Sequence, residues 1–208
     1  MQTLPEQTTI SPSVLYFGTP VVLVSTLNPD GSPNLSAMSS AWALGNRIVL
    51  GMGSGGRGIE NLERTRECVL NFPSAALWTQ VERLAPTTGV ADVPRHKQAG
   101  GYVFEADKFG RAGLTPIASE IVSPPRAAEC PIQIEASVVA VHVPVAVTGD
   151  PDGFRIVETR LERFHAHSRI VIPDSDQIDT EHWQPLLYVF RHYFGTGARL
   201  GRNFRAET

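Results

Sequence analysis

Two closely related turn sequences set the strongest limit on what this 208-residue chain can fold into. Asn28-Pro29-Asp30-Gly31 and Asp150-Pro151-Asp152-Gly153 each place proline and glycine where a tight reversal of the backbone favours them. Each turn stands between runs rich in β-branched residues, and such a unit closes locally as an antiparallel hairpin. A chain bracketed by two hairpins predicts antiparallel pairing rather than repeated crossovers between parallel strands.

The rest of the pattern favours a mainly β fold with short helices. The chain contains 18 glycines and 16 prolines, which fall between short apolar runs, as expected when turns join many strands. We expect helices from Ile59 onward and near 75–84, and long loops with an access or subunit-contact role between 79 and 125. Strands are expected at 21–27, 33–39, 47–52, 67–72, 131–143 and 154–165, the fifth with Ile132, Ile134, Ala136, Val138, Ala140 and His142 on one side.

Length, charge and composition exclude several classes of protein. We expect one domain over residues 1–208, and a net charge of -3 argues against nucleic acid as a partner. The longest apolar run, 138–147, is interrupted by a histidine and a proline, so we expect a cytoplasmic protein with no membrane partner. Cys68 and Cys130 lack a C-x-x-C spacing and are expected to be buried free thiols.

A glycine-rich loop that joins a strand to a helix predicts an anion site. Glycines let the backbone approach a ligand closely, and the first amides of the following helix are free to bind negative charge. Arg57 adds a positive charge, and Ser39, Ser40 and Ser54 add hydroxyl donors. The expected ligand is a phosphorylated cofactor. The glycines of this segment are Gly51, Gly53, Gly55, Gly56 and Gly58.

The same glycines permit a second interpretation. Residues 51–56, GMGSGG, satisfy the G-x-G-x-x-G pattern of a Rossmann dinucleotide site. That fold also needs an acidic residue about twenty positions later, to hold the ribose hydroxyls. Asn71, Phe72 and Pro73 stand there instead, and the predicted hairpins fit βαβ units poorly. A Rossmann-type NAD(P) dehydrogenase is therefore the lesser alternative.

Four segments resemble the flavin reductase-like family, which has the FMN-binding antiparallel split β-barrel (flavoredoxin-like). The resemblance spans about residues 17–194, leaving an N-terminal arm and a C-terminal tail. It implies FMN, with FAD as the alternative, bound by a homodimer, and NAD(P)H as the reductant. The segments are VVLVSTLNPDGSPNLSAMSSAW, the glycine loop with IENLERTRECVLNFPS, DKFGRAGLTP and SPPRAAECPIQIEA.

By position, the resemblance assigns ten residues to the cofactor. The implied reaction, hydride transfer between NAD(P)H and flavin, needs two stacked rings rather than an acid or base, so no catalytic side chain and no metal ligand is named. No charged cluster distinguishes NADH from NADPH, and the final electron acceptor is not indicated. The cofactor-binding residues are Met38, Ser39, Ser40, Ala41 and Trp42 from the first segment, and Gly53, Ser54, Arg57, Gly58 and Asn61 from the second.

One position departs from the family pattern. Relatives commonly place a threonine three residues before the asparagine, whereas this chain has Gly58. A lost hydrogen bond to a charged acceptor costs about 1.5 to 3 kcal/mol. Arg57 and Ser54 are candidates to compensate. The alternative function is therefore a split-barrel protein with weakened or lost flavin binding, which acts on a biosynthetic intermediate or serves as a flavin-binding module.

Three further features leave alternatives open. Trp42 fits a wall beside the flavin or a residue of the barrel core. His165 and His167, with His192, could form a metal site, but a hydrogen-bonded pair near a strand end is the favoured interpretation. The aromatic residues of the closing segment indicate a core or a subunit contact more than a cofactor site; they are Tyr188, Phe190, Tyr193 and Phe194.

Overall fold

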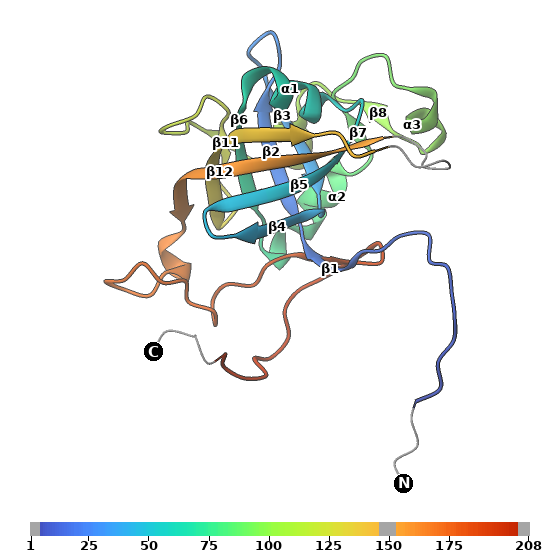
Figure 1. The fold of residues 1–208 in the computed structure, drawn as a ribbon. Helices are drawn as coiled ribbons and strands as arrows, with labels where there is room; N and C mark the ends of the chain where they lie inside the picture. The colour runs from blue at the N-terminus through green and yellow to red at the C-terminus, as the bar shows by residue number, and fades with distance from the viewer. Residues whose placement is uncertain (1–4, 146–152, 204–208) are drawn as a thin grey trace.

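A computed structural model describes residues 5–145 and 153–203 (Figure 1). Its main feature is a curled seven-stranded sheet in which every neighbouring pair is antiparallel. The strands lie in the order β3 (Pro33–Met38), β2 (Val22–Leu27), β6 (Glu67–Phe72), β11 (Ile132–His142), β12 (Phe154–Ala166), β5 (Arg47–Gly53) and β4 (Ala41–Leu44).

The two edges of this sheet are joined by two residues. Strands β3 and β4 lie at opposite edges, yet only Ser39 and Ser40 separate them in the chain. A link of this length spans roughly 10 Å at most, so the sheet has to curl until its edges approach. The amide of Gly51 in β5 donates to the carbonyl oxygen of Ser40 at 2.7 Å and holds the link in place. The result is a half-closed barrel.

Helix α1 (Arg57–Thr65) covers one end of the barrel (Figure 1). Ile59 and Leu62 point into the core, where they meet Val24, Leu50 and Leu70 from the sheet. The apolar positions are three apart, which places them on one helical face. Because α1 directly follows the glycine loop after β5, this packing also determines where the start of the helix lies.

A second core lies on the outer face of β2 and β3. Leu23 and Leu35 are fully buried there against α2 (Trp78–Leu84) and α4 (Lys108–Ala112), whose Val81 and Phe109 face the sheet. Strand β2 therefore has both faces covered, which explains its continuous apolar sequence. The 3-10 turn η1 (Ala75–Leu77) leads into α2.

The remaining elements are short. Near the barrel end that carries α1, Figure 1 shows β7, β8 and α3; at the opposite end, β1 lies beneath the sheet. Strand β1 pairs with a hairpin from the closing segment of the chain. Their bounds are β1 Phe17–Pro20, β7 Thr87–Thr88, α3 Arg95–Ala99, β8 Val103–Phe104, β9 Pro116–Ile117, β10 Arg126–Ala127, η2 Ser168–Ile170, β13 Leu187–Val189 and β14 His192–Phe194.

Most of the predicted elements are confirmed, and the structure adds several that were not predicted, among them β1, α3, α4 and the short strands β7 to β10. The six expected strands and the two expected helical regions are present, and the antiparallel sheet rules out the Rossmann alternative. Strand β4 and the β13–β14 hairpin were not expected. The predicted alternation along β11 fails beyond Val138, because a bulge before Ala140 turns Val141 toward the core. The turn predicted at residues 150–153 lies largely outside the described residues.

In the part of the chain that the structure describes, no helix has the length and apolar character required to span a membrane. The longest helix, α1, has nine residues and carries charged side chains on its outer face.

Candidate functional site

A cleft of about 450 Å³ opens where β3, β5 and the β13–β14 hairpin meet. Its floor is the junction of the two sheet edges, from Ser36 to Ser40 and from Gly51 to Gly53. This volume is in the range typical of small-molecule sites. The other side chains around it are Tyr16, Val21, Val81, Ala85, Lys97, Tyr102, Tyr188 and Tyr193.

Tyrosines form one wall of the cleft. The rings of Tyr16 and Tyr188 meet edge to face with centroids 5.2 Å apart, and those of Tyr188 and Tyr193 lie 5.5 Å apart. Burial, followed by nearby Tyr16, raises the pKa of Tyr188, and burial together with a hydrogen bond to Glu82 raises that of Tyr193. Both phenols are therefore neutral at physiological pH. The wall offers uncharged aromatic surface to a planar ligand.

Positive charge lies beside the cleft where the glycine loop follows Gly53. Helix α1 begins after Gly56, and among the described residues no side chain caps its free amides. The ammonium of Lys97 lies over this end: it donates to the carbonyl oxygen of Gly55 at 3.4 Å, and a Cβ added at Gly56 would lie 3.8 Å from it. Arg57 occupies the first helical position. A phosphate fits this donor set in charge and in hydrogen-bonding capacity.

Buried Lys108 adds to the positive charge in this region. The residue is only 5% exposed. Burial, followed by the nearby charge of Lys97, lowers the pKa of its amine to about 8, although Glu105 opposes the shift. A bound anion nearby would reduce the electrostatic repulsion between the ammonium groups of Lys97 and Lys108.

The structure brings four of the ten sequence-predicted residues into this cleft. Those that line it are Met38, Ser39, Ser40 and Gly53. Their position follows from the β3–β4 link and from the end of β5, two places where the curled sheet exposes backbone to the cleft.

The other six residues are not among those that line the cleft. Ala41 is buried in the barrel core, and the hydroxyl of Ser54 donates to the carbonyl oxygen of Gly153. Arg57 donates from Nε to the carbonyl oxygen of Gly89 at 3.2 Å and pairs with Glu60 at 2.7 Å. Asn61 is fully buried.

The surroundings of Gly58 and Trp42 are described separately, because they bear on the departure from the family pattern and on the role of Trp42. Gly58 lies against Ser36, since a Cβ added at position 58 would come within 2.8 Å of the Ser36 hydroxyl oxygen. Trp42 is 59% exposed on edge strand β4. The interpretation of Trp42 as a residue of the barrel core is therefore wrong.

Sequence reasoning missed several cleft residues. Ser36 stands in a predicted strand, but nothing in the sequence showed that it faces the glycine loop. Lys97 lies in α3 and Tyr102 just after it, within the segment between α2 and α4, where only the general expectation of functional loops applied. Tyr188 and Tyr193 were assigned to a core or a subunit contact. They do pack against the second core, and they also line the cleft.

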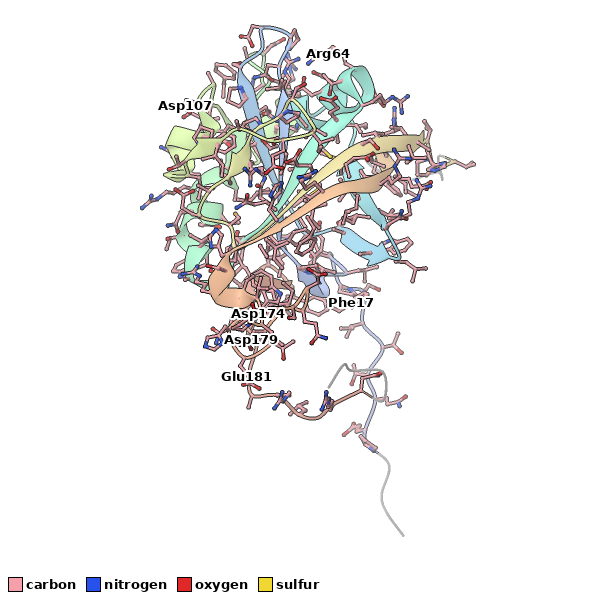
Figure 2. The ribbon with its side chains drawn as sticks, turned by 90° about the vertical axis from the view of Figure 1, so that its left-hand side faces the viewer. Phe17, Arg64, Asp107, Asp174, Asp179 and Glu181 are labelled. Carbon is pink, nitrogen blue, oxygen red and sulfur yellow. The ribbon has the colours of Figure 1, made fainter. Side chains whose placement is uncertain are left out.

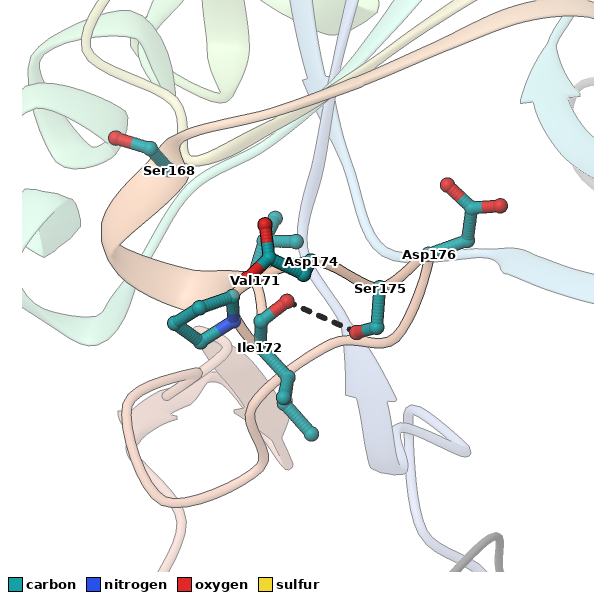
Figure 3. Close-up of a pocket in the computed structure, with 7 residues that line it drawn as sticks. Ser168, Val171, Ile172, Asp174, Ser175 and Asp176 are labelled. Atoms are coloured by element: carbon teal, nitrogen blue, oxygen red, sulfur yellow. Dashed lines mark hydrogen bonds between the residues drawn. The ribbon is translucent and has the colours of Figure 1, made fainter.

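A larger hollow of about 640 Å³ lies in the segment after β12 (Figure 3). All of its lining residues come from 168–176, and within this loop the hydroxyl of Ser175 donates to the carbonyl oxygen of Ile172. Asp174 and Asp176 carry negative charge there. Figure 2 shows Asp174, Asp179 and Glu181 gathered at the same end of the molecule, away from Arg64. A phosphorylated ligand would be repelled, so we do not assign this hollow to it.

The histidines and cysteines have partners or surroundings of their own. His165 contacts Glu135, and ring nitrogens of His167 and His192 contact the carbonyl oxygens of Ala128 and Phe190. No cluster of three metal-ligating side chains occurs among the described residues. The expected buried free thiols are confirmed at both cysteines. Burial, with Glu67 nearby, raises the pKa of Cys68 to about 12, which makes its thiolate a rare species.

Comparison with known proteins adds to this picture. Residues 14–197 match the model of the flavin reductase like domain. The chain is 47% identical over 199 residues to the uncharacterized protein YdfE of Bacillus subtilis (strain 168), an alignment that covers 96% of this chain and 94% of that protein.

Two solved structures show the same fold at low identity. Flavoredoxin of Desulfovibrio vulgaris (Miyazaki F) aligns with a TM-score of 0.76 and 20% identity, covering 97% of this chain and 99% of its own. Nitrilotriacetate monooxygenase component B from Bacillus cereus aligns with a TM-score of 0.72 and 20% identity, covering 97% and 98%. With the curled antiparallel sheet, these matches show that the chain belongs to the flavin reductase-like family and has its split β-barrel, and the family match supports a flavin-related oxidoreductase function.

Proposed function

We propose that this protein is an FMN-dependent oxidoreductase that transfers hydride between NAD(P)H and flavin. The observation that carries the proposal is the cleft, which combines a wall of neutral tyrosines with a positively charged end beside the free amides of α1. A flavin nucleotide has the matching parts, a planar ring and a phosphate. FMN is favoured over FAD because the anion-binding groups gather at one end of the cleft, where a terminal phosphate would lie.

The residues divide into two groups by what they contact in this proposal. Lys97, Arg57 and the first amides of α1 bind the phosphate. Met38, Ser39, Ser40 and Gly53 lie along the ring and offer hydroxyl and backbone groups to its polar edge. Ala41, Ser54, Gly58 and Asn61 shape the floor and the loop beneath the phosphate, and Trp42 walls off flavin at a subunit contact.

When bound, the flavin supplies the hydride-accepting chemistry. The protein's part is to hold the phosphate, to keep one ring face covered and to leave room for the nicotinamide over the other face. Holding the nicotinamide and flavin rings in contact accounts for a large part of the rate enhancement of hydride transfer. We therefore assign no side chain of this chain as acid or base.

We further propose a single domain over residues 1–208 that works as a homodimer in the cytoplasm. Both cores share strand β2, and β1 near the start of the chain pairs with β13 near its end, which supports one folding unit. Trp42 and Leu44 leave apolar surface exposed on β4, as expected of a subunit contact. Two free cysteines suit a reducing compartment.

An absorption spectrum of the freshly purified protein, followed by turnover, tests the proposal. We expect a yellow protein with the spectrum of oxidised flavin, and NADH or NADPH oxidation that depends on added FMN. Titrations with FMN, FAD and riboflavin then rank the ligands.

One observation favours the alternative of weakened flavin binding. Ser54, one of the two candidates to compensate for Gly58, already donates its hydroxyl to Gly153, and Arg57 is already paired with Glu60. A colourless protein that binds none of the three flavins and shows no flavin-dependent turnover would support that alternative.

A further inference from the structure

We propose that the hydroxyl of Ser36 donates a hydrogen bond to the phosphate of the bound flavin nucleotide, from the space that a side chain at position 58 would otherwise fill. The inference rests on the proposed function. It adds Ser36, which the sequence did not indicate, to the residues that bind the flavin. It also explains why glycine is compatible with phosphate binding at position 58.

Ser36 and Gly58 compete for the same space. A Cβ added at Gly58 would lie 2.8 Å from Oγ of Ser36, 3.5 Å from its Cβ, and 3.1 Å from Cε of Met52. Real Cβ atoms do not approach an oxygen this closely, whereas the contact with the serine Cβ would be ordinary. A side chain at position 58 would therefore displace the Ser36 hydroxyl from its present place, and in this chain position 36 carries the hydroxyl.

The hydrogen bonds of Ser36 leave its proton available. Its oxygen accepts from Nδ2 of Asn34 at 3.3 Å, and Asn34 also donates to Oγ1 of Thr26 at 3.2 Å. Asn61 donates to the same Thr26 oxygen at 3.1 Å. Among the described residues, the Ser36 hydroxyl has no acceptor. Ser36 is one of the residues that line the cleft, and a hydroxyl whose oxygen already accepts a hydrogen bond is a stronger donor.

The location of this donor indicates a phosphate rather than the polar edge of the ring. Gly58 is the second residue of α1, so its neighbour Ser36 stands beside the first turn of the helix. An acceptor held by Ser36 therefore lies within reach of the free amides and of the positive end of the cleft. A phosphate monoester has several oxygens that can meet these donors at once. Asn34, and Asn61 through Thr26, act as positioning residues for Ser36.

Comparing FMN with riboflavin tests the inference, because riboflavin lacks only the phosphate. In Ser36→Ala we expect FMN to bind roughly 10- to 100-fold more weakly, as for one lost hydrogen bond to a charged acceptor. Riboflavin affinity should stay within about twofold, and the melting temperature of the flavin-free protein should be unchanged. Ser137→Ala, which removes a serine hydroxyl from β11 outside the cleft, is the matched control.

A double substitution tests the shared space. Gly58→Thr alone should weaken FMN binding, since its side chain collides with Ser36. In Ser36→Ala/Gly58→Thr the threonine hydroxyl fills the vacated place, so FMN affinity should recover at least tenfold relative to Ser36→Ala.

Three results would each overturn the inference, provided that the wild type binds flavin. They are equal losses of FMN and riboflavin affinity in Ser36→Ala, unchanged FMN affinity in Ser36→Ala, and no recovery of FMN affinity in the double variant. A wild type that binds no flavin would instead refute the proposed function.

Discussion

Nε2 of His165 in β12 lies 2.7 Å from Oε1 of Glu135 in β11, and both side chains face the loop at 118–125. The carboxylate of Glu135 also accepts from the backbone amides of Glu120, Ile121 and Val122. Burial by itself would raise the pKa of Glu135, but these amides and His165 outweigh it and lower the pKa to about 2. The ionised carboxylate therefore fastens the loop to the barrel.

We predict that Glu135→Gln destabilises the protein by about 2 to 4 kcal/mol at pH 7, because an amide group cannot accept all of these hydrogen bonds. The pKa of Glu135 is lower in the folded state than its ordinary value of 4.5. Its stabilisation is therefore complete above about pH 4.5 and is lost as the pH falls toward 2. Urea unfolding at pH 7, 4 and 3 should show that the difference in unfolding free energy from wild type becomes smaller as the pH falls.

The control is Glu129→Gln, which changes a carboxylate that accepts from the amide of Thr115. A pH-independent difference would contradict the prediction.

Lys108 should also make stability rise with pH, but in an alkaline window and because its buried charge destabilises the folded state. Its pKa in the folded state is lowered from 10.5 to about 8, mainly by burial. Between these values the unfolded state binds more protons, so the stability of the flavin-free protein should rise as the pH increases from 8 to 10.5. Lys108→Met should stabilise the flavin-free protein by at most roughly 3 kcal/mol at pH 7 and by much less at pH 10.5. Thermal melts at both pH values test this, with exposed Arg111→Met as the control on the same helix. A Lys108→Met protein less stable than wild type at pH 7 would count against it.

Arg57 connects the start of α1 to the loop at Gly89 from the edge of the proposed phosphate site. We predict that Arg57→Ala weakens FMN binding about tenfold through the loss of a charged donor. The melting temperature of the flavin-free protein should fall by less than about 3 °C, since the pair with Glu60 is at the surface. Arg155→Ala breaks a comparable surface pair with Glu63 without reaching the cleft and should leave FMN affinity unchanged. A large loss of stability with unchanged affinity would show that Arg57 is structural.

The exposed side chains of β4 test the proposed homodimer. Trp42 and Leu44 are 59% and 74% exposed. We predict that Trp42→Glu/Leu44→Glu converts the dimer to a monomer of 22.6 kDa, because charged groups cannot be buried in an apolar contact without a partner. Light scattering after size-exclusion chromatography measures the mass. Ile121→Glu, an exposed apolar residue on the loop between β9 and β10, should remain dimeric. A wild type that is monomeric at micromolar concentration would rule the proposal out.

The sequence predicted well those helices and strands whose formation depends on neighbouring residues. The Asn28 to Gly31 turn and its flanking apolar runs produce the β2–β3 hairpin, and the glycine loop runs into α1 as expected. Strand β4 has four residues and follows β3 after two, so no separate turn signal marked it. The bulge in β11 likewise has no signal in the alternating pattern, because it depends on pairing with β12.

The site was predicted less completely than the fold. Met38, Ser39, Ser40 and Gly53 came from the segments that carry the family resemblance, and they do line one cleft. Lys97, Tyr188 and Tyr193 come from distant segments, whose approach depends on packing between α2, the long loop and the closing hairpin. Long-range packing of this kind leaves no short-range pattern in a sequence.

The sequence by itself determined the antiparallel hairpins, the glycine loop at the start of a helix and the family, because turn chemistry and side-chain alternation act over a few residues. Only the tertiary structure decided that Ser36 faces Gly58 and that tyrosines from both ends of the chain form one wall. The physical reason is the curl of the sheet. It joins the edges β3 and β4 and brings together groups whose separation along the chain says nothing about their separation in space.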